Sequence, residues 1–147
     1  MKNCSSMRKI PNEELGRPTP EAYVRMEKIP VAVVLDNIRS LHNIGSFFRT
    51  CDAFAVQEMV LCGISATPPS REIHKTALGA EHTVAWRHFP TTVEAINALR
   101  AEGYRIGAVE QVEGAVALDL FRIESGVRYA LIFGNELFGL SQDAIDE

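Results

Sequence analysis

A polar stretch that follows the first strongly apolar segment carries side chains suited to ligand binding or catalysis. Its polar side chains include Asn37, Arg39, Asn43 and Arg49. In parallel α/β sheets, ligands bind beyond the carboxyl ends of the strands, so we expect Asn37, Arg39 and Asn43 to lie near a site. The competing interpretation makes Asn43 a helix-start residue, Gly45 a close-packing residue and Arg49 a solvated arginine, and spacing alone leaves both open.

A second candidate stretch, residues 134–141, reads Gly-Asn-Glu-Leu-Phe-Gly-Leu-Ser and also follows an apolar segment. Its glycines allow backbone amides and carbonyls to approach a ligand closely. Glu136, at the expected mouth of a strand, can accept a hydrogen bond. The alternative is an ordinary turn between a strand and a helix, and geometry alone favours it because such short turns are common in α/β folds.

The elements that must position these stretches alternate between strand and helix. Apolar segments predict strands over residues 31–35, 58–61, 83–86, 104–109 and 129–133. Apolar residues at helical spacing and capping residues predict five helices. Three of them cover residues 44–55, 71–78 and 91–99, and the other two start at Thr19 and at Ser141. Pro30 is expected to end the first helix, and Phe54 or Ala55 to complete the apolar face of the second. This alternation indicates an α/β fold with a mostly parallel sheet and flanking helices.

Length and composition are those of one globular domain. The chain has 147 residues, 46% of them hydrophobic and 23% charged, which argues against a disordered, fibrous or membrane protein. Residues 1–30 are expected to form an N-terminal extension with a short helix, and residues 31–147 the domain itself. Because the chain stops within the expected first turns of the helix that begins at Ser141, we expect further C-terminal residues in the parent protein.

Charge and cysteine content bear on partners and compartment. The net charge of −4 does not predict a general nucleic-acid binder, so any RNA contact requires a local basic patch. Cys4, Cys51 and Cys62 have no CxxC spacing and are interpreted as reduced thiols of a cytoplasmic protein, two of them in the core. The four histidines have no HExxH context, so no metal site is expected.

Together, the two candidate stretches resemble the motifs of the SpoU/TrmH family of RNA ribose 2'-O-methyltransferases, within the SPOUT superfamily. The pattern Asn-x-Gly-x-x-x-Arg-Thr over residues 43–50 matches the first family motif, and residues 134–141 match the second. Residues 75–80 look like the middle segment of the family. The resemblance runs from residue 29 to the end in the family's order, and the combination is specific although each motif alone is weak.

The resemblance implies a SPOUT-type domain whose C-terminal part threads into a trefoil knot, and a homodimer with the site near the subunit interface. It implies methyl transfer from S-adenosylmethionine to a ribose 2'-hydroxyl of tRNA or rRNA. Arg49 would act at that hydroxyl, with Asn43 and Glu136 shaping the site. The loops that hold the cofactor would include Val109, Glu110, Gln111, Gly134, Asn135, Glu136, Gly139 and Leu140.

The family's third motif is missing from this chain. Only six residues follow Ser141, and none match the third motif. We therefore expect an incomplete knot and an incomplete cofactor site. The fragment can be inactive even if its parent is an enzyme. Two alternatives stay open: a non-catalytic RNA-binding module of the same fold, and a small-ligand α/β domain unrelated to RNA. For residues 71–75 a solvated helix face is as well supported as RNA contact. The basic candidates for RNA contact are Arg39, His42, Arg71, His74 and Lys75.

Overall fold

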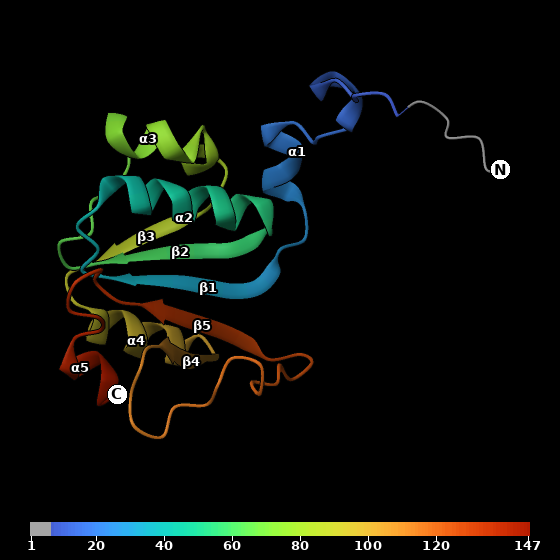
Figure 1. The fold of residues 1–147 in the computed structure, drawn as a ribbon. Coiled ribbons are helices and arrows are strands. Elements are labelled where there is room, and N and C mark those ends of the chain that lie inside the picture. The colour runs from blue at the N-terminus through green and yellow to red at the C-terminus, as the bar shows by residue number, and fades with distance from the viewer. Residues whose placement is uncertain (1–6) are drawn as a thin grey trace.

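Five parallel strands form one sheet in the order β3-β2-β1-β5-β4 (Figure 1). The computed structural model describes residues 7–147, so Cys4 lies outside the described residues. The expected α/β class with a mostly parallel sheet is confirmed, and burial on both faces explains the continuous apolar runs. The strands are β1 (Ile29–Asp36), β2 (Val56–Cys62), β3 (Trp86–Phe89), β4 (Tyr104–Val109) and β5 (Arg128–Phe133).

Helices cover both faces of this sheet (Figure 1). One face carries α2 (Leu41–Ala53) and α3 (Arg71–Ala77), and the other carries α4 (Thr92–Ala101) and α5 (Gln142–Ile145). Side chains alternate along a strand, so Val33 and Leu35 of β1 pack into the core beneath α2. Their neighbours Ala32 and Val34 pack into the second core, beneath α4. Within residues 7–147, none of the helices has the length and apolar character needed to cross a membrane.

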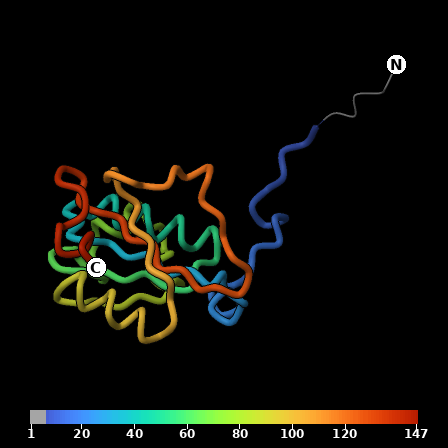
Figure 2. Tube along the Cα trace, turned by 90° about the horizontal axis from the view of Figure 1, so that it is seen from below, coloured from blue at the N-terminus to red at the C-terminus, as the bar shows by residue number. Residues whose placement is uncertain are grey.

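The N-terminal segment lies to one side of the domain and is attached to it by a short helix (Figures 1 and 2). Thr19 caps that helix by accepting a hydrogen bond from the backbone N–H of Ala22, as the sequence predicts. Tyr23 anchors it by donating its hydroxyl to the carbonyl of Asp52 at 2.6 Å. The segment contains the 3₁₀ helix η1 (Asn12–Leu15) and α1 (Pro20–Arg25).

The end of α1 was predicted wrongly. The helix ends at Arg25, and Pro30 lies inside β1 instead of terminating α1. The pairing of β1 with β2 shifts register between Ile29 and Ala32. Such an irregularity tolerates a residue that has no N–H to donate, which explains how a proline fits at the start of a central strand.

Several other boundaries shift by one to three residues, and two of these shifts have a clear structural reason. β3 begins at Trp86, not at residue 83, because Thr83 ends the 3₁₀ helix η2 (Ala80–His82), with its N–H and its hydroxyl both donating to the carbonyl of Ala80. Phe54 and Ala55, one of which was expected to complete the apolar face of α2, both follow the last helical residue, and Phe54 is 67% exposed. In both places a turn, and not the apolar pattern of the sequence, sets the boundary of the element.

Cys51 and Cys62 are free and buried, which confirms that these two cysteines lie in the core. Burial raises the pKa of each thiol to about 12. Because the thiolate is the reactive form of cysteine, both side chains are poor nucleophiles at neutral pH. They therefore contribute packing to the domain, on opposite faces of the sheet.

Gly45 allows α2 and α3 to approach each other closely. A Cβ on Gly45 would lie 2.1 Å from Oγ1 of Thr76 and 2.3 Å from the carbonyl oxygen of Ile73. The Thr76 hydroxyl donates to the carbonyl of His42 at 2.8 Å and thereby joins the two helices. Close packing, one of the two interpretations of Gly45 from the sequence, is thus what the structure shows.

Gly45→Ala is expected to lower the free energy of unfolding by roughly 1–3 kcal/mol, the usual range for overpacked sites. The added methyl group meets backbone of α3, which cannot move aside without shifting the whole helix. Urea denaturation measures the change. Ser46→Ala, at an exposed position of the same helix, is the control and is expected to stay within about 0.5 kcal/mol of wild type. Unchanged stability of Gly45→Ala would contradict the close contact.

Candidate functional site

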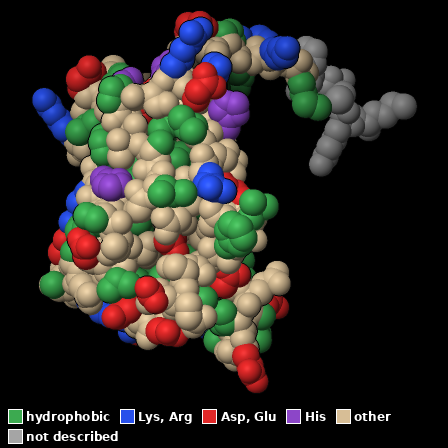
Figure 3. Space-filling view, turned by 90° about the vertical axis from the view of Figure 1, so that its left-hand side faces the viewer, with side chains coloured by type: hydrophobic (Ala, Val, Ile, Leu, Met, Phe, Trp, Pro, Cys, Tyr) green, Lys and Arg blue, Asp and Glu red, His purple; other side chains and the backbone are tan. Residues whose placement is uncertain are grey.

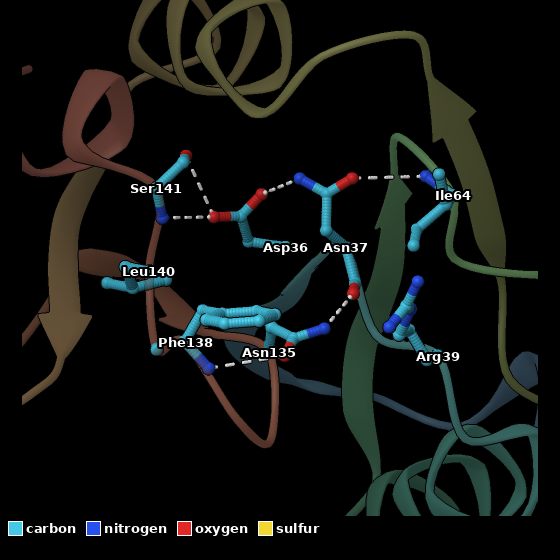
Figure 4. Close-up of a pocket in the computed structure, with 9 residues that line it drawn as sticks. Asp36, Asn37, Arg39, Ile64, Asn135, Phe138, Leu140 and Ser141 are labelled. Atoms are coloured by element: carbon cyan, nitrogen blue, oxygen red, sulfur yellow. Dashed lines mark hydrogen bonds between the residues drawn. The ribbon is translucent and has the colours of Figure 1, made fainter.

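A pocket opens at the carboxyl ends of β1 and β5 (Figure 4). From β1 the chain proceeds to β2 on one side, and it later returns to place β5 on the other side, so strand order reverses here. Open α/β sheets bind ligands at such switch points. The lining residues are Asp36, Asn37, Arg39, Ile64, Asn135, Phe138, Gly139, Leu140 and Ser141.

Asp36, the last residue of β1, joins three elements beneath the pocket. The residue is 1% exposed. One carboxylate oxygen accepts hydrogen bonds from the side-chain amide of Asn37 at 2.8 Å and the hydroxyl of Thr92 at 2.5 Å. The other oxygen accepts from the backbone N–H of Ser141 at 2.8 Å and from its hydroxyl at 2.9 Å (Figure 4). Asp36 therefore ties the end of β1 to the starts of α4 and α5.

Two asparagines extend this network across the pocket. Asn37 has a left-handed backbone, with φ 54°, which asparagine tolerates better than most residues. Its side-chain oxygen accepts from the N–H of Ile64 at 3.2 Å. Its carbonyl accepts from the side-chain amide of Asn135 at 2.8 Å, although the two residues lie 98 positions apart. The loops that follow β1, β2 and β5 are thereby held against one another (Figure 4).

The loop after β5 is a closed turn that depends on two glycines. The backbone N–H groups of Asn135 and Gly139 each donate to the other residue's carbonyl at 2.9 Å. The Asn135 side chain also accepts from the N–H groups of Leu137 and Phe138. A Cβ on Gly134 would lie 2.2 Å from the carbonyl carbon of Gly139, and Gly139 itself has φ 68°. Both positions therefore favour glycine.

Glu110 connects the loop after β4 to this turn. Because β4 pairs with β5 in parallel, the residues that follow the two strands lie side by side. Glu110 accepts hydrogen bonds from the N–H groups of Gln111 and Leu140, both at 2.8 Å, and these bonds lower its pKa. The two loops predicted to hold a cofactor therefore contact each other, while their role in binding stays a prediction.

Asn43 and Glu136, which lie 93 positions apart, meet at the start of α2. The side-chain amide of Asn43 donates to a carboxylate oxygen of Glu136 at 2.9 Å, and the N–H of Ser40 donates to the same oxygen at 3.3 Å. Burial raises the pKa of Glu136, but hydrogen bonds from its own backbone, from Asn43 and from Ser40 outweigh burial and lower it. Ser40, not Asn43, caps α2, which leaves the Asn43 side chain free for this contact.

Replacing Asn43 by alanine is expected to raise the pKa of Glu136 toward its ordinary value of 4.5, because the carboxylate loses a donor. Carboxyl-carbon NMR titration measures this pKa directly. Ser46→Ala on the same helix is the control and should leave it unchanged. A Glu136 pKa at or above 4.5 in the unaltered chain would contradict the geometry.

The same bonds predict a pH dependence of stability. A carboxyl group whose pKa is lowered by folding stabilises the folded state fully above its unfolded pKa, and this contribution is lost as pH falls through the folded pKa. The stability advantage of the unaltered chain over Glu136→Gln is therefore expected above pH 4.5 and should disappear in more acid solution. Urea denaturation of both chains across that range tests the sign.

Arg49 lies apart from the Asn43–Glu136 pair. It is exposed and follows Asn43 by six residues on α2, which places it about 240° further around the helix axis at about 100° per residue. Within residues 7–147, the hydrogen bonds of Asn43 and Glu136 do not include Arg49. The structure thus brings together two of the three predicted catalytic residues.

The basic side chains predicted to contact RNA have different surroundings. Arg39 lines the pocket (Figure 4), and Arg71 lines a separate hollow. Lys75 and His42 both contact Glu72, at 2.7 and 3.3 Å, and the bond from Lys75 lowers the pKa of Glu72. Figure 3 shows the face at the carboxyl ends of the strands, where basic and acidic side chains are intermixed. Two of the predicted RNA contacts, Lys75 and His42, therefore share an acidic neighbour, and their role in RNA binding stays a prediction.

Sequence reasoning assigned no role to Asp36 and expected Ser141 to cap α5. Ser141 does occupy the position before α5, but its side chain makes no capping hydrogen bond and instead donates to Asp36. One signal was available: an acidic residue directly after an apolar strand in an α/β protein stands where ligand sites form. Its partners could not be read from the sequence, because Thr92 and Ser141 follow it by 56 and 105 positions.

Comparison with known proteins identifies relatives of this chain. The family model described as the SpoU rRNA methylase family matches residues 30–147. The tRNA (guanosine(18)-2'-O)-methyltransferase of Thermus thermophilus is 28% identical over 132 residues, which cover 90% of this chain and 66% of that protein. The sequence similarity therefore includes both candidate stretches and the strands that carry them.

Solved structures show the same fold. The AdoMet-bound rRNA methyltransferase from Sinorhizobium meliloti matches with a TM-score of 0.73 and 25% identity, over 85% of this chain and 48% of that chain. The TrmH/SpoU tRNA modifying enzyme of A. aeolicus matches with a TM-score of 0.71 and 21% identity, over 84% of this chain and 62% of that chain. The chain thus spans roughly half to two thirds of the length of the relatives named here.

Proposed function

Because this chain belongs to the SpoU rRNA methylase family, we propose that it carries the reaction site of an S-adenosylmethionine-dependent RNA ribose 2'-O-methyltransferase that acts on tRNA or rRNA. The observation that supports this most is the hydrogen bond between Asn43 and Glu136 beside the switch-point pocket. The two residues come from the two stretches that resemble the family's motifs. Neither side chain lines the pocket, but Arg39 and Asn135, which lie near them in sequence, do, and distant polar residues that meet near a pocket are typical of a reaction site.

The pocket and its loops fit S-adenosylmethionine. Phe138 is 80% exposed and lies at the pocket (Figure 4), and large apolar side chains beside a few fixed polar groups are typical of cofactor sites. The turn from Gly134 to Gly139, closed by its own backbone hydrogen bonds, would form one wall of the cofactor site, while Glu110 holds the turn in place. When bound, S-adenosylmethionine supplies an electrophilic methyl group.

The chain's own residues would position the ribose and stabilise charge. Methyl transfer needs the hydroxyl oxygen aligned with the methyl group, so positioning carries much of the barrier. Glu136, held by Asn43, can accept a hydrogen bond from a ribose hydroxyl. Arg49 is always protonated and cannot act as a simple base. It would bind the target phosphate or stabilise the negative charge that develops on the ribose oxygen, while the phosphate or another group takes the proton.

Arg49→Lys is expected to reduce methyl transfer by at least about tenfold, since lysine keeps the charge but loses the planar fork of donors. Cofactor affinity should stay unchanged because Arg49 lies outside the pocket. Initial rates with radiolabelled S-adenosylmethionine, measured in the product of the whole gene, give the effect, and Arg122→Lys, at an exposed arginine elsewhere, is the control. Near-full activity of Arg49→Lys would remove Arg49 from the mechanism.

Several finer features belong to the same proposal. Residues 31–147 would be the SPOUT methyltransferase domain, with residues 1–30 as an extension, and the C-terminal part would enter a trefoil knot. The protein would form a homodimer in the cytoplasm, with the site near the subunit interface. Exposed apolar side chains around the pocket, Leu137 at 76% and Phe138 at 80%, support a covered surface there. Light scattering of the purified protein tests the dimer.

The decisive test of function combines cofactor binding with methylation. Calorimetry with S-adenosylmethionine is performed on this chain and on the product of the whole gene that encodes it, followed by radiolabelled methyl transfer to tRNA and rRNA transcripts. Methylation at a ribose 2'-hydroxyl is the expected result. RNA binding without cofactor binding or methylation in the whole gene product would overturn the proposal and indicate a non-catalytic RNA-binding module.

A further inference from the structure

Three side chains with metal-ligating atoms converge at the end of α3, outside the site described above. His74 of α3 and Glu81 and His82 of η2 place their ligand atoms within 4.8 Å of one another. Nδ1 of His74 lies 2.5 Å from Oε1 of Glu81, and Nε2 of His82 lies 3.6 Å from the same oxygen. The cluster was not visible in the sequence, because the spacing of these ligands fits no common metal motif.

Glu81 is a buried carboxylate whose ion-pair partners are two histidines. Its side chain is 4% exposed, whereas those of His74 and His82 are 58% and 71% exposed. One oxygen, Oε2, accepts from the N–H of Gly79 at 3.1 Å, which orients the carboxylate and leaves Oε1 facing the two imidazoles. Within residues 7–147, its ion-pair partners are these two histidines and include no lysine or arginine. A buried carboxylate is normally paired with a cation or a metal.

A hollow gives access to the cluster from solvent. It is lined by Pro69, Ser70, Arg71, His74, Glu81 and His82, and it shares no residue with the switch-point pocket. Two ligands reach it from exposed positions, so an ion can enter without opening the core. Arg71 at its edge opposes a bare cation and favours water or an anion as a further ligand.

We propose that His74, Glu81 and His82 bind one divalent transition-metal ion of the zinc class. Two imidazoles and a carboxylate suit Zn²⁺, Co²⁺ or Ni²⁺, whereas Mg²⁺ and Ca²⁺ prefer sites made of oxygen ligands. Three protein ligands leave one tetrahedral position for a water molecule or another ligand. The ion ties the end of α3 to η2 and stabilises the segment that packs on α2.

The distances are compatible with such a site after a small movement. Zinc bonds of about 2.0–2.1 Å in a tetrahedron place neighbouring ligand atoms roughly 3.3 Å apart. The His82–Glu81 distance of 3.6 Å is close to that value, and the His74–Glu81 distance of 2.5 Å must lengthen. Rotation of the exposed His74 ring accomplishes this, while the buried Glu81 stays in place.

Calorimetric titration of the purified chain with Zn²⁺, and separately with Mg²⁺, tests the proposal. The expected result is one Zn²⁺ per chain, a Zn²⁺-dependent rise in melting temperature, and no comparable Mg²⁺ binding. His82→Gln and His74→Gln should each weaken Zn²⁺ binding by at least about tenfold, because even partners outside a coordination shell commonly contribute roughly 10–100-fold. Both altered side chains are exposed, so these variants retain the core.

His88→Gln is the matched control, since His88 is an exposed histidine outside the cluster that contacts the carbonyl of Gly63. It should bind Zn²⁺ as the unaltered chain does. Absence of Zn²⁺ binding by the unaltered chain would overturn the proposal, as would equal affinities of His82→Gln, His74→Gln and His88→Gln. Circular dichroism of each variant confirms that a lost site does not reflect a lost fold. The outcome is independent of methyl transfer, which the Zn²⁺ titration does not measure.

Discussion

Asp36→Ala is expected to lower the free energy of unfolding by roughly 2–4 kcal/mol, a large effect for one side chain. The residue is 1% exposed, and its loss leaves the donors of Asn37, Thr92 and Ser141 without their acceptor. Thr92 is buried, and a buried donor left unpaired costs more than the hydrogen bond it had contributed. The starts of α4 and α5 then lose their connection to β1.

Asp36→Asn tests whether the volume of the side chain or its acceptor oxygens stabilise the folded state. The amide has nearly the same volume, but one acceptor oxygen becomes a donor that faces another donor, so little of the lost stability should return. Urea denaturation measures stability, and calorimetry measures S-adenosylmethionine affinity, which should fall in both variants because Ser141 lines the pocket. Asp119→Asn, at an exposed position, is the control. Wild-type stability of Asp36→Asn would show that the four hydrogen bonds do not hold this edge of the domain together.

Gly134→Ala is expected to weaken S-adenosylmethionine binding by at least about tenfold while the rest of the domain stays folded. The new Cβ would lie 2.2 Å from the carbonyl carbon of Gly139 and 2.3 Å from the backbone nitrogen of Leu140. Both contacts are with backbone, so the turn must open instead of a side chain moving aside. A displacement of the order of 1 Å at a reaction site is enough to cost roughly 100-fold in rate.

Gly107→Ala provides a matched comparison for this change. Gly107 lies in β4, where an added Cβ meets only the tip of Leu131 at 3.3 Å, a contact that a flexible side chain relieves. It should leave cofactor affinity within about twofold of wild type, corresponding to less than 0.5 kcal/mol. Equal cofactor affinities of Gly134→Ala and Gly107→Ala would show that the turn after β5 does not hold the cofactor.

Local sequence patterns were sufficient for most of the secondary structure. The range of β4 agrees with its prediction, and Thr91 caps α4 through the N–H of Glu94 as the capping pattern indicates. Such features depend on residues within a few positions of each other, so short windows of sequence contain them. Among the errors, those at Pro30 and Thr83 occurred where pairing with a distant strand or the closing of a turn decided the boundary.

By itself, the sequence determined the α/β class, the two motif-bearing stretches and the family they resemble, because periodicity and motif spacing are local properties. Only the tertiary structure places β5 beside β1, and with it Asn43 meets Glu136 and Asp36 meets Ser141, while Arg49 is not among the hydrogen-bond partners of these residues. It also decided that Glu72 meets His42, which lies 30 positions away, and that Glu81 lies between two histidines. Contacts between residues up to 105 positions apart depend on strand order and helix orientation, which no short window of sequence records.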